Sequence, residues 1–242
     1  MNNAWTITHR KEAESTNLLA AGLPAWHAIR ADVQTAGRGR FQRSWVSDAG
    51  GLWLSAVVPI DITSEGGRLL PLAAGLAVCD TLRSLGVQQL RMRWPNDVMV
   101  GNRKIAGLLI DQFKSGLAVV GIGVNVFNKP EEQKPELRGS VARLADVATA
   151  PLELDLLTAA LLDALRSVAS ELHAGRFPAL LERVNALWHL AGEVELDLDH
   201  ETRRGRFGGV DGDGRLILID KRGAASVFPP EQARHLSELT LT

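Results

Sequence analysis

The fold is decided between Leu90 and Val126, where the chain reads LRMRWPNDVMVGNRKIAGLLIDQFKSGLAVVGIGVNV. Apolar and polar residues alternate before Pro95, and Gly101-Asn102 is a recognised two-residue turn, so this stretch predicts successive strands that include a hairpin. The predicted strands cover Leu90 to Trp94, Val98 to Val100, Arg103 to Asp111 and Leu117 to Val126. Consecutive strands without helices between them favour an α+β layer structure with a mainly antiparallel or mixed sheet over a doubly wound nucleotide-binding fold.

The flanking sequence predicts further strands and helices. Upstream, polar residues Glu14 to Asn17 indicate the N-cap of a short helix, and strands are expected at Ala28 to Val33 and Gly51 to Val58. Apolar residues with a 3.6-residue period predict a helix that ends at Gly86: Leu69, Leu72, Leu76, Cys79 and Leu82. Downstream we expect an exposed loop from Lys129 to Gly139, then helices from Leu152 to Ala174 and Pro178 to Leu190.

The pattern changes after Gly192. Short alternating strands joined by Gly/Asp turns, such as Asp211 to Gly214, indicate a small β-barrel-like domain. A boundary near residues 189–192 would separate a catalytic domain, residues 1–190, from a C-terminal β domain, residues 191–242.

Composition excludes several classes of protein. The chain has 242 residues, 45% hydrophobic and 23% charged, with a formal net charge of -1, which argues against a bulk nucleic-acid binder. A single cysteine, Cys79, excludes an intrachain disulfide, and its helical spacing predicts a buried core position. Neither a secretory signal nor an apolar run long enough to cross a bilayer is evident, so we expect a cytoplasmic protein without a membrane partner.

Arginine and glycine are concentrated between Gln34 and Trp45. Glycine lets main-chain N–H groups approach a ligand, and the guanidinium groups of Arg38, Arg40 and Arg43 match phosphate or carboxylate oxygens. The loop therefore predicts an anion site, although a solvated basic loop would have the same composition.

Two further segments carry polar residues at strand ends. Asn96-Asp97 follows Pro95, and the predicted hairpin returns Lys104 towards this pair, where a lysine at the start of an apolar strand either reaches water or meets an anion. Pro-Asn-Asp is also an ordinary turn signal. Farther on, the glycines of Gly121 to Asn125 permit close backbone approach, and Asn125 is expected to point into a pocket.

Taken together in order, these motifs resemble the catalytic core of biotin-protein ligase, also called biotin-[acetyl-CoA-carboxylase] ligase. The resemblance spans Glu14 to Val126 and rests on Glu-Ser-Thr-Asn, Gly-Arg-Gly-Arg-x-x-Arg-x-Trp, Arg-Trp-Pro-Asn-Asp-Val, Arg-Lys-Ile-Ala-Gly-Leu-Leu and Gly-Ile-Gly-Val-Asn-Val. It implies a class II synthetase-like catalytic domain followed by a small SH3-like β-barrel domain. Because it begins close to Met1, we expect a monofunctional ligase without the DNA-binding domain of bifunctional members.

The resemblance also implies a reaction. Such ligases activate biotin with Mg-ATP to biotinyl-5'-AMP and pyrophosphate, then transfer biotin to a lysine of biotin carboxyl carrier protein. A homodimer through the central sheet is expected by analogy. The alternatives are a lipoate or octanoate transferase of related fold, and a non-catalytic protein that senses biotin or binds the carrier.

The resemblance assigns roles residue by residue. Lys104 and Arg40 are expected to be catalytic, and Asp97 to be the carboxylate near Mg²⁺. The biotin-binding residues would be Ser15, Thr16, Asn17, Gln34, Arg38, Gly39, Arg40 and Lys104. The ATP-binding residues would be Arg38, Arg40, Arg43, Trp45, Arg93, Asn96, Asp97, Lys104 and Asn125. The chain departs from the family pattern at Gln42, where glycine is usual, and at Arg93, where lysine is commoner.

Overall fold

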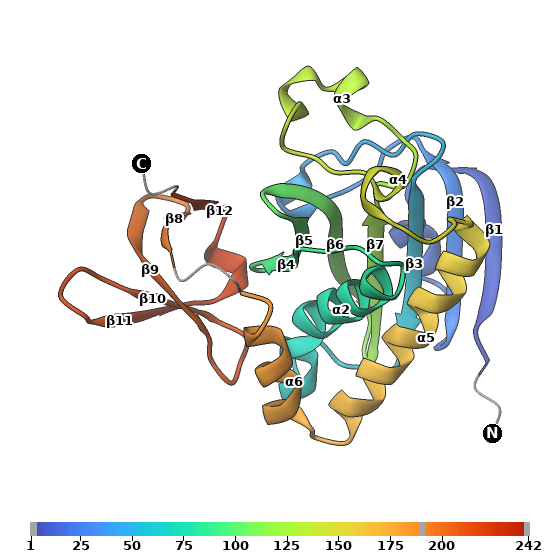
Figure 1. Cartoon of the computed structure of the whole chain (residues 1–242). Coiled ribbons are helices and arrows are strands. Elements are labelled where there is room, and N and C mark those ends of the chain that lie inside the picture. Colours follow the sequence, from blue (N-terminus) through green and yellow to red (C-terminus); the bar gives the residue numbers. More distant parts are fainter. Residues whose placement is uncertain (1–3, 189–191, 240–242) are drawn as a thin grey trace.

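The computed structural model describes residues 4–188 and 192–239, which form a larger and a smaller sheet with helices (Figure 1). The larger sheet has seven strands in the order β1 (Thr6–Ala13), β2 (His27–Gln34), β3 (Leu52–Val58), β7 (Leu117–Val124), β6 (Arg103–Lys114), β5 (Asp97–Val100) and β4 (Leu90–Arg93). Strands β1 and β2 are parallel, and the other neighbours are antiparallel. The α+β class with a mixed, mainly antiparallel sheet is therefore confirmed.

The predicted hairpin is present around Gly101-Asn102. A register shift between Val98 and Met99 places Lys104 opposite Met99, two residues from Asp97 along β5. The main chain of Lys104 thus lies nearer the turn than Asp97, and its side chain spans the remaining distance to the carboxylate. The sequence did not predict β1, whose Thr-Ile-Thr-His-Arg-Lys-Glu-Ala is mostly polar and exposed and is held at the edge by pairing with β2.

Helices cover one face of this sheet. The long helices α2 (Glu65–Ser84) and α5 (Leu154–His173) cross it side by side, with α6 (Phe177–Asn185) near their lower ends in Figure 1. Cys79 lies fully buried in this core, as expected, and burial raises the pKa of its thiol to about 12. The short helix α1 (Thr16–Ala20) contacts β2, β3 and β7 and begins after Ser15, whose side chain makes no capping hydrogen bond.

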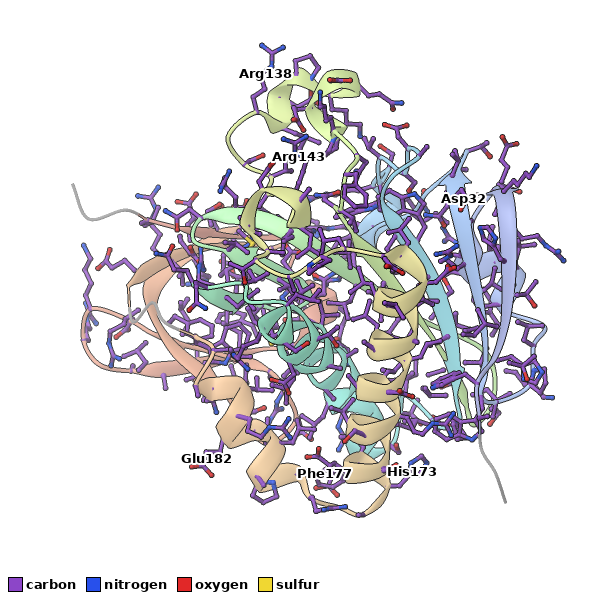
Figure 2. The ribbon with its side chains drawn as sticks, turned by 45° about the vertical axis from the view of Figure 1, so that its right-hand side comes forward. Asp32, Arg138, Arg143, His173, Phe177 and Glu182 are labelled. Atoms are coloured by element: carbon purple, nitrogen blue, oxygen red, sulfur yellow. The ribbon has the colours of Figure 1, made fainter. Side chains whose placement is uncertain are left out.

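The segment between β7 and α5 differs from the exposed loop predicted for Lys129 to Gly139. It contains α3 (Pro130–Gln133) and the 3-10 helix η2 (Pro135–Leu137), and α4 (Leu144–Val147) follows. Pro130 is buried, and Lys134 donates a hydrogen bond to Ser44 of the arginine loop. Most of the segment is exposed, as expected, but the prediction of a loop without helix was wrong. Proline can start a helix, and contacts with a distant loop hold this one in place. Figure 2 shows Arg138 at the outer end of the segment.

The C-terminal residues form a five-stranded antiparallel sheet in the order β11 (Ala225–Phe228), β10 (Leu216–Ile219), β9 (Thr202–Val210), β8 (Glu193–Asp197) and β12 (His235–Glu238). The predicted domain boundary falls on residues 189–191, which lie outside the described residues. The helix predicted to run to Leu190 was too long, because α6 ends at Asn185 and residues 186–188 are not helical.

The two sheets are held together by polar contacts. Trp94 Nε1 donates to the Gly214 carbonyl oxygen over 3.0 Å, and the buried Arg91 forms an ion pair with Glu238. Arg91 Nη2 lies 2.7 Å from Glu238 Oε2. These contacts fix β12 and the residues before it, beginning at Ala233, beside the ends of β4 and β5.

Candidate active site

A row of glycines leaves one face of the central sheet bare. Pairing aligns Gly107 of β6 with Gly123 of β7, and Gly121 lies opposite Ser55 of β3. A Cβ atom at Gly123 would lie 2.7 Å from Trp45 Nε1, and one at Gly121 would lie 2.3 Å from Asn17 Oδ1. Larger residues would therefore displace the side chains that rest on this surface, which confirms the close backbone approach expected of Gly121 to Asn125.

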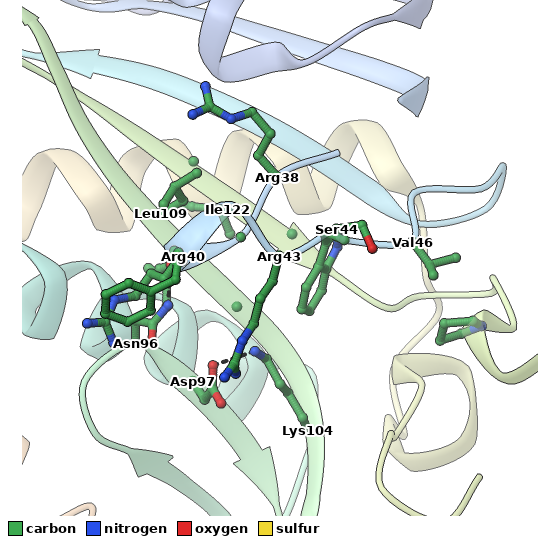
Figure 3. Close-up of a pocket in the computed structure, with 18 of the residues that line it drawn as sticks. Arg38, Arg40, Arg43, Ser44, Val46, Asn96, Asp97, Lys104, Leu109 and Ile122 are labelled. Carbon is green, nitrogen blue, oxygen red and sulfur yellow. Dashed lines mark hydrogen bonds and ion pairs between the residues drawn. The ribbon is translucent and has the colours of Figure 1, made fainter. Parts of the chain in front are cut away.

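Above these glycines lies a cavity of about 270 Å³. The structure brings together around it every site residue that the sequence predicted: Ser15, Thr16, Asn17, Gln34, Arg38, Gly39, Arg40, Arg43, Trp45, Arg93, Asn96, Asp97, Lys104 and Asn125. Figure 3 shows how the arginines differ: Arg43 points towards Asp97 and Lys104, whereas Arg38 points away from that pair. Asn125 is buried, and its Oδ1 accepts from Asn128 Nδ2 over 3.2 Å.

One end of the cavity is lined by neutral hydrogen-bonding groups. Gln34 Oε1 accepts from the Thr16 main-chain N–H over 2.8 Å, and Gln34 Nε2 donates to Ser47 Oγ over 2.9 Å. Ser55, fully buried in β3, places Oγ 2.7 Å from Thr16 Oγ1 and 2.6 Å from Asn17 Oδ1. These bonds fix the polar side chains before any ligand arrives, which suits recognition of a polar but uncharged group.

The other end of the cavity is cationic. Asp97 forms ion pairs with Lys104 through Oδ1 and with Arg93 through Oδ2, the latter at 2.6 Å. Burial raises the pKa of Asp97, but Lys104 and Arg93 outweigh it and hold that pKa below its ordinary value. The carboxylate is therefore charged at neutral pH, and it fixes both cations on the cavity wall.

The arginine loop closes this end. Arg40 donates hydrogen bonds to the carbonyl oxygens of Pro230 and Ala233, the latter at 3.3 Å, so the loop is tied to the C-terminal sheet. Burial lowers the pKa of Arg40, and nearby Arg43 adds to the effect, whereas Asp97 and Glu231 oppose it. Phe41 and Gln42 both adopt left-handed backbone conformations, with φ of 54° and 59°. Gln42 thus stands in a conformation that glycine adopts at less cost.

The sequence missed several residues of the site. Ser55 does not line the cavity, but it bonds to Thr16 and Asn17, which do. It had a recognisable signal, because it is a single hydroxyl within the apolar strand Leu-Trp-Leu-Ser-Ala-Val-Val. His235 and its neighbours Ala233 and Arg234 had none, because they reach the cavity from a different sheet. Burial lowers the pKa of His235, with Arg93 and Arg43 adding to the effect. Lys134 lines the cavity from the segment that was expected to be an exposed loop.

A magnesium site built from protein carboxylates does not fit this geometry. The described residues contain no group of three or more His, Cys, Asp or Glu side chains that could hold a metal ion. Both oxygens of Asp97, the expected metal ligand, contact cations, Lys104 through Oδ1 and Arg93 through Oδ2. The role of Asp97 beside Mg²⁺ stays a prediction.

The cavity has a neutral end with fixed hydrogen-bonding groups and a cationic end, an arrangement suited to a polar organic group beside an anion. The family model for the biotin/lipoate A/B protein ligase family matches residues 6–126. The chain belongs to this family.

Relatives agree with that membership. A biotin protein ligase from Aquifex aeolicus, solved in complex with biotin and ATP, superposes with a TM-score of 0.85 at 25% identity, covering 97% of this chain and 99% of that one. The bifunctional ligase/repressor BirA of Bacillus subtilis is 28% identical over 218 residues, or 85% of this chain, and the match spans 65% of BirA. The biotin-[acetyl-CoA-carboxylase] ligase of Mycobacterium tuberculosis is 39% identical over 111 residues, 44% of this chain and 41% of the relative. This chain thus spans less than two thirds of the length of the ligase/repressor it matches.

Proposed function

We propose that this protein is an ATP-dependent biotin protein ligase that forms biotinyl-5'-AMP and transfers biotin to a lysine of a biotin carboxyl carrier protein. The observation that carries the proposal is one cavity with two unlike ends, one neutral and hydrogen-bonded and the other cationic. The neutral end suits the ureido ring of biotin, and the cationic end suits a carboxylate and a triphosphate. Relatives named as biotin ligases support the choice of substrate over lipoate or octanoate.

In the first half-reaction, a carboxylate oxygen of biotin attacks the α-phosphorus of ATP, an O–P bond forms, and pyrophosphate leaves. Two anions must meet, so catalysis requires cations that neutralise both and hold them in line. Lys104 lies at the cationic end, held by Asp97, with its Nζ over the Trp45 ring, 4.7 Å from the ring centroid. We assign Lys104 to the biotin carboxylate and the α-phosphate.

Arg40 and the loop around it would retain the product of this step. The mixed anhydride is reactive towards water, and a loop closed over it slows hydrolysis. Arg40 is the loop residue tied to the C-terminal sheet, so its contacts with Pro230 and Ala233 hold the loop across the cavity mouth. ATP would bring Mg²⁺ bound mainly by phosphate oxygens, because the protein offers few free carboxylate ligands here.

In the second half-reaction, the uncharged amine of the carrier lysine attacks the biotinyl carbonyl carbon, an amide bond forms, and AMP leaves. The amine must lose a proton, and no side chain is assigned as its base.

We also propose that the protein is cytoplasmic and forms a homodimer. No described helix is long and apolar enough to traverse a membrane. Sedimentation would measure the oligomeric state.

One experiment tests the function. The protein is incubated with biotin, Mg-ATP and a purified carrier fragment, and pyrophosphate release and carrier mass are followed together. A ligase releases pyrophosphate and increases the mass of one carrier lysine by one biotinyl group. Lipoate or octanoate in place of biotin should give neither signal. Biotin binding without pyrophosphate would instead identify a sensing protein and reject the proposal.

A further inference from the structure

Asp111 lies beneath the neutral end of the cavity and has no part in the reaction proposed above. Its Oδ2 accepts from Asn17 Nδ2 over 2.8 Å, and the same nitrogen lies 3.3 Å from the Leu109 carbonyl oxygen. An ionised carboxylate and a backbone carbonyl both accept hydrogen bonds and donate none. The amide nitrogen of Asn17 must therefore face these two groups, and the amide oxygen must face the opposite way.

The orientation of Asn17 fixes the next group in the chain of bonds. Asn17 Oδ1 lies 2.6 Å from Ser55 Oγ, and an amide oxygen can only accept. Ser55 has a single hydroxyl proton, so it gives that proton to Asn17. The oxygen of Ser55 is then left as an acceptor, 2.7 Å from Thr16 Oγ1.

The same reasoning places the Thr16 hydroxyl proton. Besides Ser55, the Thr16 hydroxyl has Gln34 Oε1 as a neighbour at 3.0 Å. This amide oxygen already accepts from the Thr16 main-chain N–H, and it cannot donate. The Thr16 hydroxyl therefore donates either to Ser55 or to Gln34, and both lie within the network. Neither hydroxyl then has a proton left for a ligand, and Thr16, which lines the cavity, presents oxygen lone pairs.

Gly121 keeps this network in place. It lies opposite Ser55 in the sheet, and a Cβ atom there would lie 2.3 Å from Asn17 Oδ1. Asn17, Thr16 and Ser55 are all buried, so water is largely excluded as a substitute partner that could relax the polarity.

We propose that Asp111 is a positioning residue that fixes the hydrogen-bond polarity of the neutral end, making it an acceptor surface for the N–H groups of a cyclic urea. The inference rests on the proposed function, since it concerns how the biotin ring is selected. Asp111 acts through Asn17 and Ser55 and does not itself line the cavity.

Asp111→Asn tests the proposal with almost no change of shape. An amide can donate as well as accept, so Asn17 can turn over and release the Ser55 proton to Thr16 Oγ1, which leaves the Thr16 proton free to point towards the ligand. The probes are biotin and its two cyclic carbamate analogues, in each of which a ring oxygen replaces one ureido N–H. The measured quantity is the ratio of dissociation constants, analogue to biotin, from calorimetric titration.

The wild-type protein should reject at least one carbamate strongly, because ring oxygen would face hydroxyl oxygen. Asp111→Asn should reduce this discrimination by about tenfold or more, since a site built for an N–H donor is selective only while its polarity is fixed. Asp111→Glu keeps the acceptor and should restore most of the discrimination. Asp32→Asn, the same change on β2 beside the exposed His9, should leave the ratio unaltered.

The outcomes separate the two proposals. If the wild type binds biotin and Asp111→Asn discriminates as sharply as the wild type, the polarity inference is wrong and the ligase assignment stands. If the wild type does not bind biotin, both fail. Should Asp111→Asn lose its folded circular dichroism spectrum, Ser55→Ala interrupts the same chain one step farther on. An unchanged ratio in that variant would also reject the inference.

Discussion

The neutral and cationic ends of the cavity are built in opposite ways. At the neutral end, Thr16, Asn17, Gln34 and Ser55 satisfy one another's hydrogen bonds before a ligand binds. At the cationic end, positive groups outnumber negative ones among the described residues: Arg40, Arg43, Arg93 and Lys104 surround Asp97, and the exposed Glu231 is a further carboxylate near Arg40.

This difference explains how one cavity can bind two unlike substrates. A satisfied network of neutral groups is rigid and selects by shape and polarity, at little electrostatic cost. A surplus of buried and half-buried positive charge is unfavourable until an anion neutralises it, so its free energy is recovered when phosphate or carboxylate binds. Substitutions at the neutral end should therefore weaken biotin binding, and substitutions at the cationic end should slow pyrophosphate release.

Lys104→Ala should give the largest effect. Loss of the cation shared by biotin carboxylate and α-phosphate should reduce the rate of pyrophosphate release by about 100-fold to 1,000-fold, as removal of one preorganised charge does elsewhere. Biotin affinity should fall much less, because the neutral end remains intact. Lys114→Ala, an exposed lysine at the end of the same strand, is the matched control. Unaltered pyrophosphate release in Lys104→Ala would reject the assignment.

Gly121→Ala should damage the neutral end alone. The new methyl group would overlap Asn17 Oδ1 and force that side chain from its place, weakening biotin binding by about tenfold or more, or at least ~1.4 kcal/mol. Affinity for ATP, titrated separately, should stay near the wild-type value. Gly22→Ala is the control, because a Cβ there meets nothing within 4 Å. Equal losses for biotin and ATP would show that the ends are not independent.

Arg40→Gly should shorten retention of the adenylate. Without its bonds to Pro230 and Ala233, the loop loses its hold on the C-terminal sheet, and biotinyl-5'-AMP should escape about tenfold faster. Escape is measured as biotin attached to lysines of an unrelated protein added to the reaction. Arg138→Gly, at the exposed end of the α3 segment, controls for loss of an arginine. If the variant and the wild type label the added protein equally, the loop does not retain the intermediate.

Gln42→Gly should have two small and opposing effects on stability. Glycine adopts φ of 59° without the cost that glutamine bears, but it also gains freedom in the unfolded chain, so the free energy of unfolding should change by no more than about 1 kcal/mol. A more mobile loop should leak adenylate more readily. Urea unfolding and the labelling assay measure the two quantities on the same sample, and a stability loss well above that limit would contradict the backbone argument.

The smallest effect is expected in acid. The pKa of Asp97 is lower in the folded state, so its ion pairs contribute their full stability above the ordinary carboxylate pKa of about 3.9 and lose it as pH falls through the lowered folded value. Asp97→Asn should therefore be less stable than the wild type at pH 6, and the difference should shrink below pH 4. A difference that stays constant from pH 6 to pH 3 would show that the ion pairs are not its cause.

Local sequence was enough for much of the architecture. The hairpin at Gly101-Asn102, helix α2 and the strand containing Gly121 depend on turn residues and on periodicity, which act between neighbours in the chain. Strand β1 could not be found in this way, because its alternation is masked by polar residues on both faces and its stability comes from β2. Helix α3 was missed for a similar reason, since Lys134 is held by Ser44.

Residue types in the sequence predicted the chemical groups of the cavity: three neutral polar residues after Glu14, an arginine loop with glycines, and Lys104 at the start of an apolar strand. Their arrangement depends on how the chain folds. Folding placed Arg40 on the carbonyls of Pro230 and Ala233, engaged both oxygens of Asp97, and turned Arg38 away from that pair. The reason is physical: residue type fixes charge and hydrogen-bonding capacity, whereas direction and partner depend on strands and loops that meet only when the chain is folded.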